Sequence, residues 1–192
     1  MIRDYLFFVR RFQQIEGDFL EITDFIDLSD NFDDCCYKIG SSKMMDFCLK
    51  IGTEVETLFG ILLESKRFDR HPDITEKRRS QNITVYQEII EPEYRLRDYK
   101  LFVKLIKHDI TPFKDFDTQP PDWFPIYSKY KHKKTELIEK WNLKHSLFAL
   151  GCLALLIINH PSLDGNPFQK QELSQRVFDT LTIKGTFAII IL

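Results

Sequence analysis

The sequence has few of the residues that interrupt regular structure and no long apolar segment. Its 192 residues include only seven glycines and eight prolines, against seventeen phenylalanines. Sandwiches and barrels of β-strands need frequent turns, so this balance favours helices. The most apolar stretch, residues 147–158, is too short to span a bilayer and suits a buried helix. Composition therefore predicts a globular, α-rich chain that does not enter a membrane.

The four cysteines lack the arrangement of a disulfide framework or a zinc site. Cys35 and Cys36 are neighbours, whereas Cys48 and Cys152 lie in apolar runs. We therefore expect reduced thiols, no metal and no other cofactor. The first residues become amphipathic at once and lack the apolar core of a signal peptide. The expected location is the cytoplasm.

Charge of one sign is not in excess. The chain has 27 basic and 29 acidic residues, with a formal net charge of −2. The chain therefore has no overall positive charge that would bind nucleic acid, and only a local basic patch could do so.

Two heptad patterns predict long helices near the N-terminus. In the first, which we expect to end near Leu28, apolar residues recur every seven positions at Tyr5, Phe12, Phe19 and Ile26. The second, expected from about Ser42 to Glu64 with Ser41 or Ser42 as its cap, repeats at Met44, Ile51 and Leu58. Such seams pack helices against one another in a bundle.

The rest of the chain predicts shorter elements and one central helix. A short helix is expected from residue 82 to about Pro92, and residues 99–106 form either an extended excursion or a small hairpin. An aromatic, proline-rich loop follows at 111–125. The stretch from 142 to about 159 is apolar nearly all round, so it is expected to be the central helix.

These elements predict an all-α fold with up-and-down connections. The long aromatic and proline-rich loop, or the small extended excursion, precedes a basic helix. Residues 1–160 are expected to form the bundle, and residues 161–192 an appendage packed on it.

The basic helix, which is expected to begin near Asp122, carries the candidate site. Within it His132 lies among Lys129, Lys131, Lys133 and Lys134. Neighbouring positive charge disfavours protonation of an imidazole, and a neutral imidazole can take a proton from a ribose hydroxyl while lysines hold the phosphate. A solvated basic face without chemistry is the alternative interpretation. The sequence has no glycine-rich phosphate loop, nucleophile elbow or His-Glu-x-x-His motif.

Three stretches of the sequence together resemble HEPN-like bacterial proteins. They are residues 51–56 (IGTEVE), the WFxxYSxxKH stretch from Trp123 to His132, and the Asn142-Leu143-Lys144 entry to the apolar helix. The resemblance covers about residues 1–160. It implies an α-helical bundle that dimerises and, in many members, a metal-independent ribonuclease of toxin–antitoxin or antiviral defence systems. The motif of that family is an Arg and a His with four to six residues between them. Here it is degenerate, because no Arg lies at that distance before any of the five histidines.

The resemblance places a site on the basic helix. His132 would be the general base, and Glu54 of the second helix would orient or polarise the basic helix. Tyr127 and Tyr130 would stack on bases. The backbone of RNA would contact Ser128, Lys129, Lys131, Lys133 and Lys134.

Two hypotheses follow for the function. The first is an RNA-targeting protein, and if it is an enzyme, an endoribonuclease, with a cognate antitoxin or a nucleotidyltransferase-type protein as a further partner. The second is a non-catalytic helical module for dimerisation or protein interaction that uses the same basic helix. Both include a homodimer, because an aromatic flank comprising Phe7, Phe8, Phe12, Phe19 and Phe25 exceeds what one seam covers.

Overall fold

The computed structural model describes residues 2–24, 26–132, 140–163, 178–183 and 188–190. Its helices are α1 (Ile2–Thr23), α2 (Ser42–Leu63), α3 (Ile74–Arg79), α4 (Ile83–Tyr94), α5 (Trp123–His132) and α6 (Leu143–Ile158). Its strands are β1 (Tyr99–Val103), β2 (His108–Ile110), β3 (Phe178–Ile183) and β4 (Ala188–Ile190). Single 3₁₀ turns are η1 (Cys35–Lys38), η2 (Lys66–Phe68), η3 (Leu96–Asp98) and η4 (Pro161–Leu163). The prediction of a mostly helical protein is confirmed.

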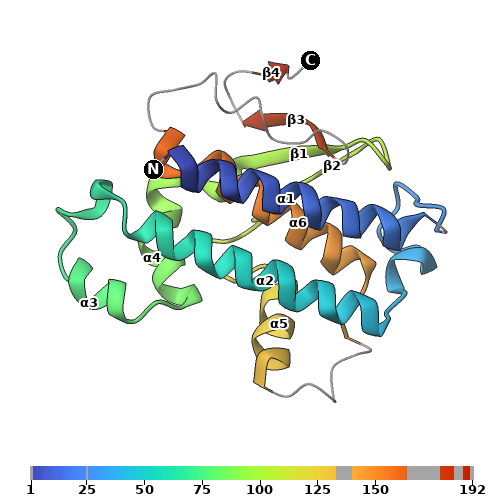
Figure 1. Ribbon diagram of the computed structural model, residues 1–192, viewed down its shortest axis with the longest axis horizontal. Coiled ribbons are helices and arrows are strands. Elements are labelled where there is room, and N and C mark those ends of the chain that lie inside the picture. The colour runs from blue at the N-terminus through green and yellow to red at the C-terminus, as the bar shows by residue number, and fades with distance from the viewer. Residues whose placement is uncertain (1, 25, 133–139, 164–177, 184–187, 191–192) are drawn as a thin grey trace.

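Helices α1 and α2 lie side by side and run in opposite directions (Figure 1). Three ion pairs between them show this antiparallel arrangement, because the partners on α2 have lower residue numbers as those on α1 have higher ones. They are Arg11–Glu54 at 2.8 Å, Asp18–Lys50, and Glu21–Lys43 at 3.4 Å. The predicted seams are buried in the core, except for Ile26, which lies beyond the end of α1 and is partly buried. Helix α2 begins where predicted, and the Ser41 hydroxyl accepts a hydrogen bond from the Met44 amide.

Helix α6 is the centre of the molecule, as its apolar sequence predicts. Its N-cap is Asn142, whose side chain accepts a hydrogen bond from the His145 amide at 3.0 Å. One side of α6 packs on α1 and α2. On another side, Gly151 lies against Pro112 and against Leu101 and Ile110 of the β1–β2 hairpin, and a Cβ there would lie only 2.7 Å from Pro112 Cγ. Helix α6 therefore joins the helical layer to the sheet.

The sheet is the part of the fold that an all-α class does not contain. Residues 99–110 form an antiparallel hairpin, one of the two alternatives expected there. Strand β3 pairs antiparallel with the other edge of β1, with Leu101 opposite Leu181, and β4 pairs with β3. The strand order is therefore β2-β1-β3-β4. Backbone pairing thus connects the predicted C-terminal appendage to residues 99–103.

Two predicted helix ends shift by a few residues. Helix α1 stops at Thr23, five residues before Leu28, and the Thr23 hydroxyl bonds the Leu20 carbonyl at 3.0 Å. Helix α4 continues past Pro92 to Tyr94, and Arg95 ends it with φ of 50°.

The proline-rich loop, residues 111–122, is held by aromatic contacts, as predicted. Phe113 and Phe116 are fully buried, with ring centroids 5.9 and 5.7 Å from that of Phe59 on α2. The Gln87 side-chain amide also donates to the Phe116 carbonyl at 2.9 Å. The start of α5 is thereby fixed against the bundle.

The aromatic flank of α1 is mostly internal, contrary to the argument for a homodimer. Phe8, Phe12 and Phe19 are buried within the single chain, whereas Phe7 is 60% exposed. Phe25 lies outside the described residues. Among the described residues of this flank, only Phe7 is exposed, and its neighbour Leu6 is 36% exposed.

No helix in the described residues is both long enough and apolar enough to cross a membrane.

Candidate functional site

Helix α5 has one buried face and one exposed face. The buried face consists of Trp123, Phe124, Tyr127 and Tyr130, at the spacing of one side of a helix. Ser128, Lys129, Lys131 and His132 are exposed. Of the predicted site, Lys133 and Lys134 lie outside the described residues.

Tyr127 attaches α5 to α2 through a slot at Gly52. A Cβ atom at Gly52 would lie 2.3–2.6 Å from the Tyr127 ring, so only glycine leaves room for this ring. The Tyr127 hydroxyl donates a hydrogen bond to a Glu56 carboxylate oxygen at 2.9 Å. Burial, reinforced by the Glu56 charge, raises the pKa of Tyr127 above its usual value. This hydroxyl therefore stays protonated and acts as a donor.

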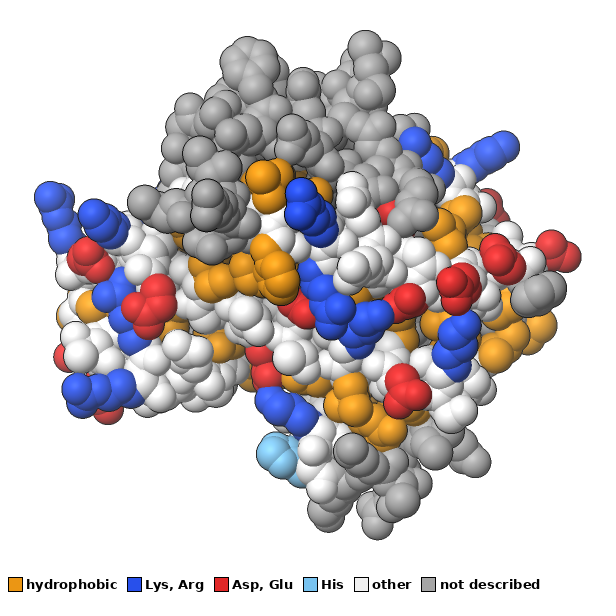
Figure 2. All heavy atoms as spheres, in the orientation of Figure 1, with side chains coloured by type: hydrophobic (Ala, Val, Ile, Leu, Met, Phe, Trp, Pro, Cys, Tyr) orange, Lys and Arg blue, Asp and Glu red, His pale blue; other side chains and the backbone are white. Residues whose placement is uncertain are grey.

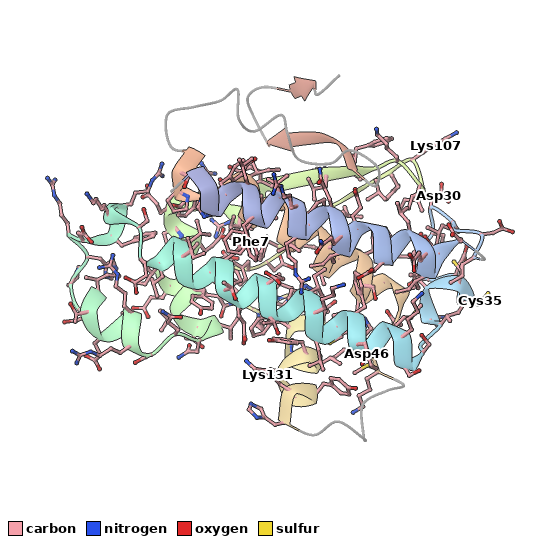
Figure 3. The ribbon with its side chains drawn as sticks, in the orientation of Figure 1. Phe7, Asp30, Cys35, Asp46, Lys107 and Lys131 are labelled. Atoms are coloured by element: carbon pink, nitrogen blue, oxygen red, sulfur yellow. The ribbon has the colours of Figure 1, made fainter. Side chains whose placement is uncertain are left out.

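The same carboxylate oxygen of Glu56 also pairs with Lys131, whose Nζ lies 2.6 Å away. Figure 3 labels Lys131 on α5. The ammonium group lies 5.5 Å from the centroid of the Tyr127 ring, within the range of a cation–π contact. Glu56 thus neutralises part of the positive charge predicted for the basic helix.

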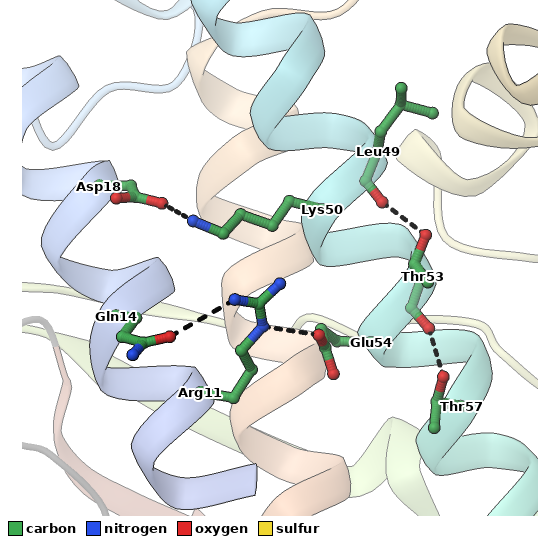
Figure 4. A network of polar contacts seen from close by, with 8 residues as sticks. All are labelled: Arg11, Gln14, Asp18, Leu49, Lys50, Thr53, Glu54 and Thr57. Atoms are coloured by element: carbon green, nitrogen blue, oxygen red, sulfur yellow. Dashed lines mark hydrogen bonds and ion pairs between the residues drawn. The ribbon is translucent and has the colours of Figure 1, made fainter. Parts of the chain in front are cut away.

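Glu54 does not have the place predicted for it. Its side chain, 13% exposed, points to α1 and accepts a hydrogen bond from Arg11 Nε at 2.8 Å (Figure 4). The contact expected of Glu54 is made by Glu56 instead. Residues two positions apart on a helix differ in direction by about 200°. Glu56 follows Gly52 by four residues, so both lie on the side of α2 that α5 approaches. This spacing is the sequence signal that could have identified Glu56.

The two tyrosines also differ from the prediction. Tyr127 is fully buried and Tyr130 is 7% exposed. A base can stack only on a ring face that solvent reaches. Neither ring is therefore available for the stacking predicted from the sequence.

Of the predicted site residues that the structure describes, Ser128, Lys129 and His132 remain exposed and form no ion pair with another described residue. Among the described residues, no group of three or more His, Cys, Asp or Glu side chains could hold a metal ion. Charge over the face of α1 and α2 is mixed, with acidic and basic side chains interspersed (Figure 2).

No family model, curated protein or solved structure matches this chain. The HEPN-like resemblance stays a prediction.

Proposed function

We propose that the chain is a non-catalytic, HEPN-like helical module that docks an acidic protein partner on the exposed face of α5. The observation that carries this proposal is the division of α5 into buried aromatic rings and exposed basic groups. Lys129 and His132 offer charge and hydrogen bonds to solvent, whereas Tyr127 and Tyr130 are buried. Such a face attracts an acidic surface without stacking on bases.

The positions of the carboxylates support docking over catalysis. A general base needs a partner that orients it. Glu54 is engaged by Arg11, and Glu56 is shared by Tyr127 and Lys131. Neither carboxylate is therefore available to orient His132.

The second candidate is the metal-independent endoribonuclease of a toxin–antitoxin or antiviral defence system. The exposed imidazole of His132, one residue from Lys131, favours it. Its site would need a homodimer that brings two α5 helices to a common cleft, and the exposed Leu6 and Phe7 of α1 offer an apolar contact for such a dimer. RNA would then be the substrate, and a cognate antitoxin or nucleotidyltransferase-type protein the regulatory partner.

Lys129→Glu and His132→Ala separate the two candidates. The probes are a fluorescent twelve-residue polyglutamate peptide and a twelve-nucleotide single-stranded RNA at low salt. Docking predicts that Lys129→Glu weakens peptide binding by roughly tenfold and that His132→Ala leaves it within about twofold. Lys100→Glu, at an exposed position of β1, is the matched control and should bind like the wild type.

RNA cleavage that His132→Ala abolishes while RNA binding persists would overturn docking in favour of the enzyme. Peptide binding that Lys129→Glu and Lys100→Glu weaken equally would overturn the assignment to α5.

A further inference from the structure

A cavity of about 320 Å³ lies between the proline-rich loop and the first turns of α5 and α6. Phe32, from the connection between α1 and α2, closes one side of it. This volume falls at the lower end of the range for small-molecule sites. The cavity is separate from the exposed face of α5, and neither proposed function uses it.

Flat apolar side chains form part of the cavity lining, among polar residues that include Thr111 and Gln119. The rings of Phe32 and Phe148 meet edge to face with centroids 5.5 Å apart, and the buried Trp123 lies on the same lining. Pro112, Pro120 and Pro121 contribute further rigid surface. Flat aromatic walls of this kind favour a planar ring as ligand.

The cavity lining carries two basic and two acidic side chains. Lys144, on the first turn of α6, is half-buried, whereas Lys114, Asp115 and Asp122 on the lining are exposed. The Lys144 ammonium lies 5.8 Å from the Phe32 ring centroid. Within the described ranges, Lys144 forms no ion pair with a carboxylate. A half-buried cation with only an aromatic face as partner is stabilised further by an anion.

A neutral hydrogen-bonding group adjoins Lys144. His145 also lines the cavity, and burial lowers its pKa below the usual value, although the nearby Asp122 opposes this shift. At neutral pH the ring therefore adds no charge and can donate or accept one hydrogen bond.

The lining is held in place before any ligand arrives. The carbonyl of Pro112, on the lining, accepts a hydrogen bond from the buried Cys152 thiol at 3.4 Å. Asp117, elsewhere in the same loop, pairs with Arg97 at 2.6 Å. Preformed walls reduce the entropy lost on binding.

We propose that this cavity binds a small planar aromatic anion. Its ring lies against Phe32 and Phe148, beside the buried Trp123, and its carboxylate or phosphate contacts Lys144. Aromatic carboxylates and aromatic phosphates share this chemistry, because each has a flat ring that carries one anionic group.

The test uses the full-length chain and three related probes: 2-naphthoate, 2-naphthyl phosphate and the uncharged 2-naphthamide. Calorimetry gives affinities, and quenching of tryptophan emission reports a ring beside Trp123. We expect at least one anion to bind tenfold or more tightly than the amide. Whichever anion binds more tightly identifies the ligand class as carboxylate or phosphate.

Lys144→Gln should remove most of that preference while leaving the weak affinity for the amide. Lys100→Gln, which neutralises an exposed lysine on β1 outside the cavity, is the matched control and should keep the preference. Far-UV circular dichroism checks that both variants fold. Equal affinity for all three probes, or a preference that survives Lys144→Gln in a folded variant, would overturn the proposal.

Discussion

At the scale of single residues, Gly52 shows how one missing side chain positions a helix. It lies mid-helix inside an apolar seam, where glycine normally costs helix stability. The Tyr127 ring occupies the space that a Cβ would need. The cost of glycine in α2 is therefore offset by the burial of an aromatic ring from α5.

Gly52→Ala should destabilise the protein by about 1–3 kcal/mol, because the added methyl overlaps a buried ring that has no room to move. Gly60→Ala, in the same helix, is the matched control. Its Cβ would meet only the end of the Gln81 side chain at 3.0 Å, so helix propensity should make it neutral or stabilising by up to about 1 kcal/mol. Urea unfolding measures both variants. Equal effects would argue against the Tyr127 contact.

Glu91 is a second residue whose surroundings dominate its chemistry. It is 1% exposed in α4, and burial raises the pKa of its carboxyl from 4.5 to about 7, against the opposing hydrogen bond from the Arg97 amide. Below about pH 4.5 the folded and unfolded chains both hold this proton. Between pH 4.5 and 7 the unfolded chain ionises first, so stability falls as the pH rises through this window.

Glu91→Gln should remove this dependence because an amide does not ionise. At pH 8 we expect the variant to be more stable than the wild type by on the order of 2–3 kcal/mol, and at pH 4.5 to be nearly equal to it. Urea unfolding at both values tests this. Glu93→Gln, at an exposed site on the same helix, should follow the wild-type profile. A Glu91→Gln profile parallel to that of the wild type would contradict the expectation.

At the scale of elements, the sequence predicts those parts whose pattern is local. The heptads locate α1 and α2, and the apolar run locates α6, because a 3.6-residue period needs no knowledge of distant segments. Strand β3 pairs with β1 across 75 or more residues. Residues 99–106 have no clear helical face, but their sequence does not reveal the partner strand that completes the sheet.

The candidate site was only partly predictable for a related reason. Pattern analysis identifies α5 as basic and aromatic, but not which side of α2 it meets. Glu54 and Glu56 point in directions about 200° apart, so the choice depends on packing. Tyr127 was expected to face a ligand, whereas it faces Gly52. A glycine within an apolar seam is the local signal for such a close approach.

Glu56→Gln tests how α5 is held as an element. It removes the charge that Tyr127 and Lys131 share, so we expect a loss of about 1–2 kcal/mol and faster amide exchange confined to α5. Glu54→Gln is the matched change on the other side of α2 and breaks the pair with Arg11. It should leave exchange in α5 unchanged. Exchange in α5 that responds to Glu54→Gln would restore Glu54 as the residue that orients this helix.

At the scale of the whole molecule, α6 packs against both the helices and the sheet, so we expect the two layers to unfold as one cooperative unit. It packs on α1 and α2 on one side and on the β1–β2 hairpin on another. The proline-rich loop reaches it too, through the bond from Cys152 to the Pro112 carbonyl. Loss of the sheet would therefore expose a surface of α6 that is fully buried in the intact fold.

Gly151→Ala should show this coupling. The added Cβ would lie 2.7 Å from Pro112 Cγ and 3.2 Å from Ile110 Cδ1, so we expect a loss of about 1–3 kcal/mol from overpacking against the proline-rich loop and the hairpin. Because α6 is shared, tryptophan fluorescence near α5 and far-UV circular dichroism should shift to the same lower urea midpoint, with an unchanged slope. Trp123 and Trp141, whose rings lie 6.1 Å apart, supply the fluorescence signal. An early transition seen by circular dichroism alone would mean that the hairpin unfolds separately from the helices around α6.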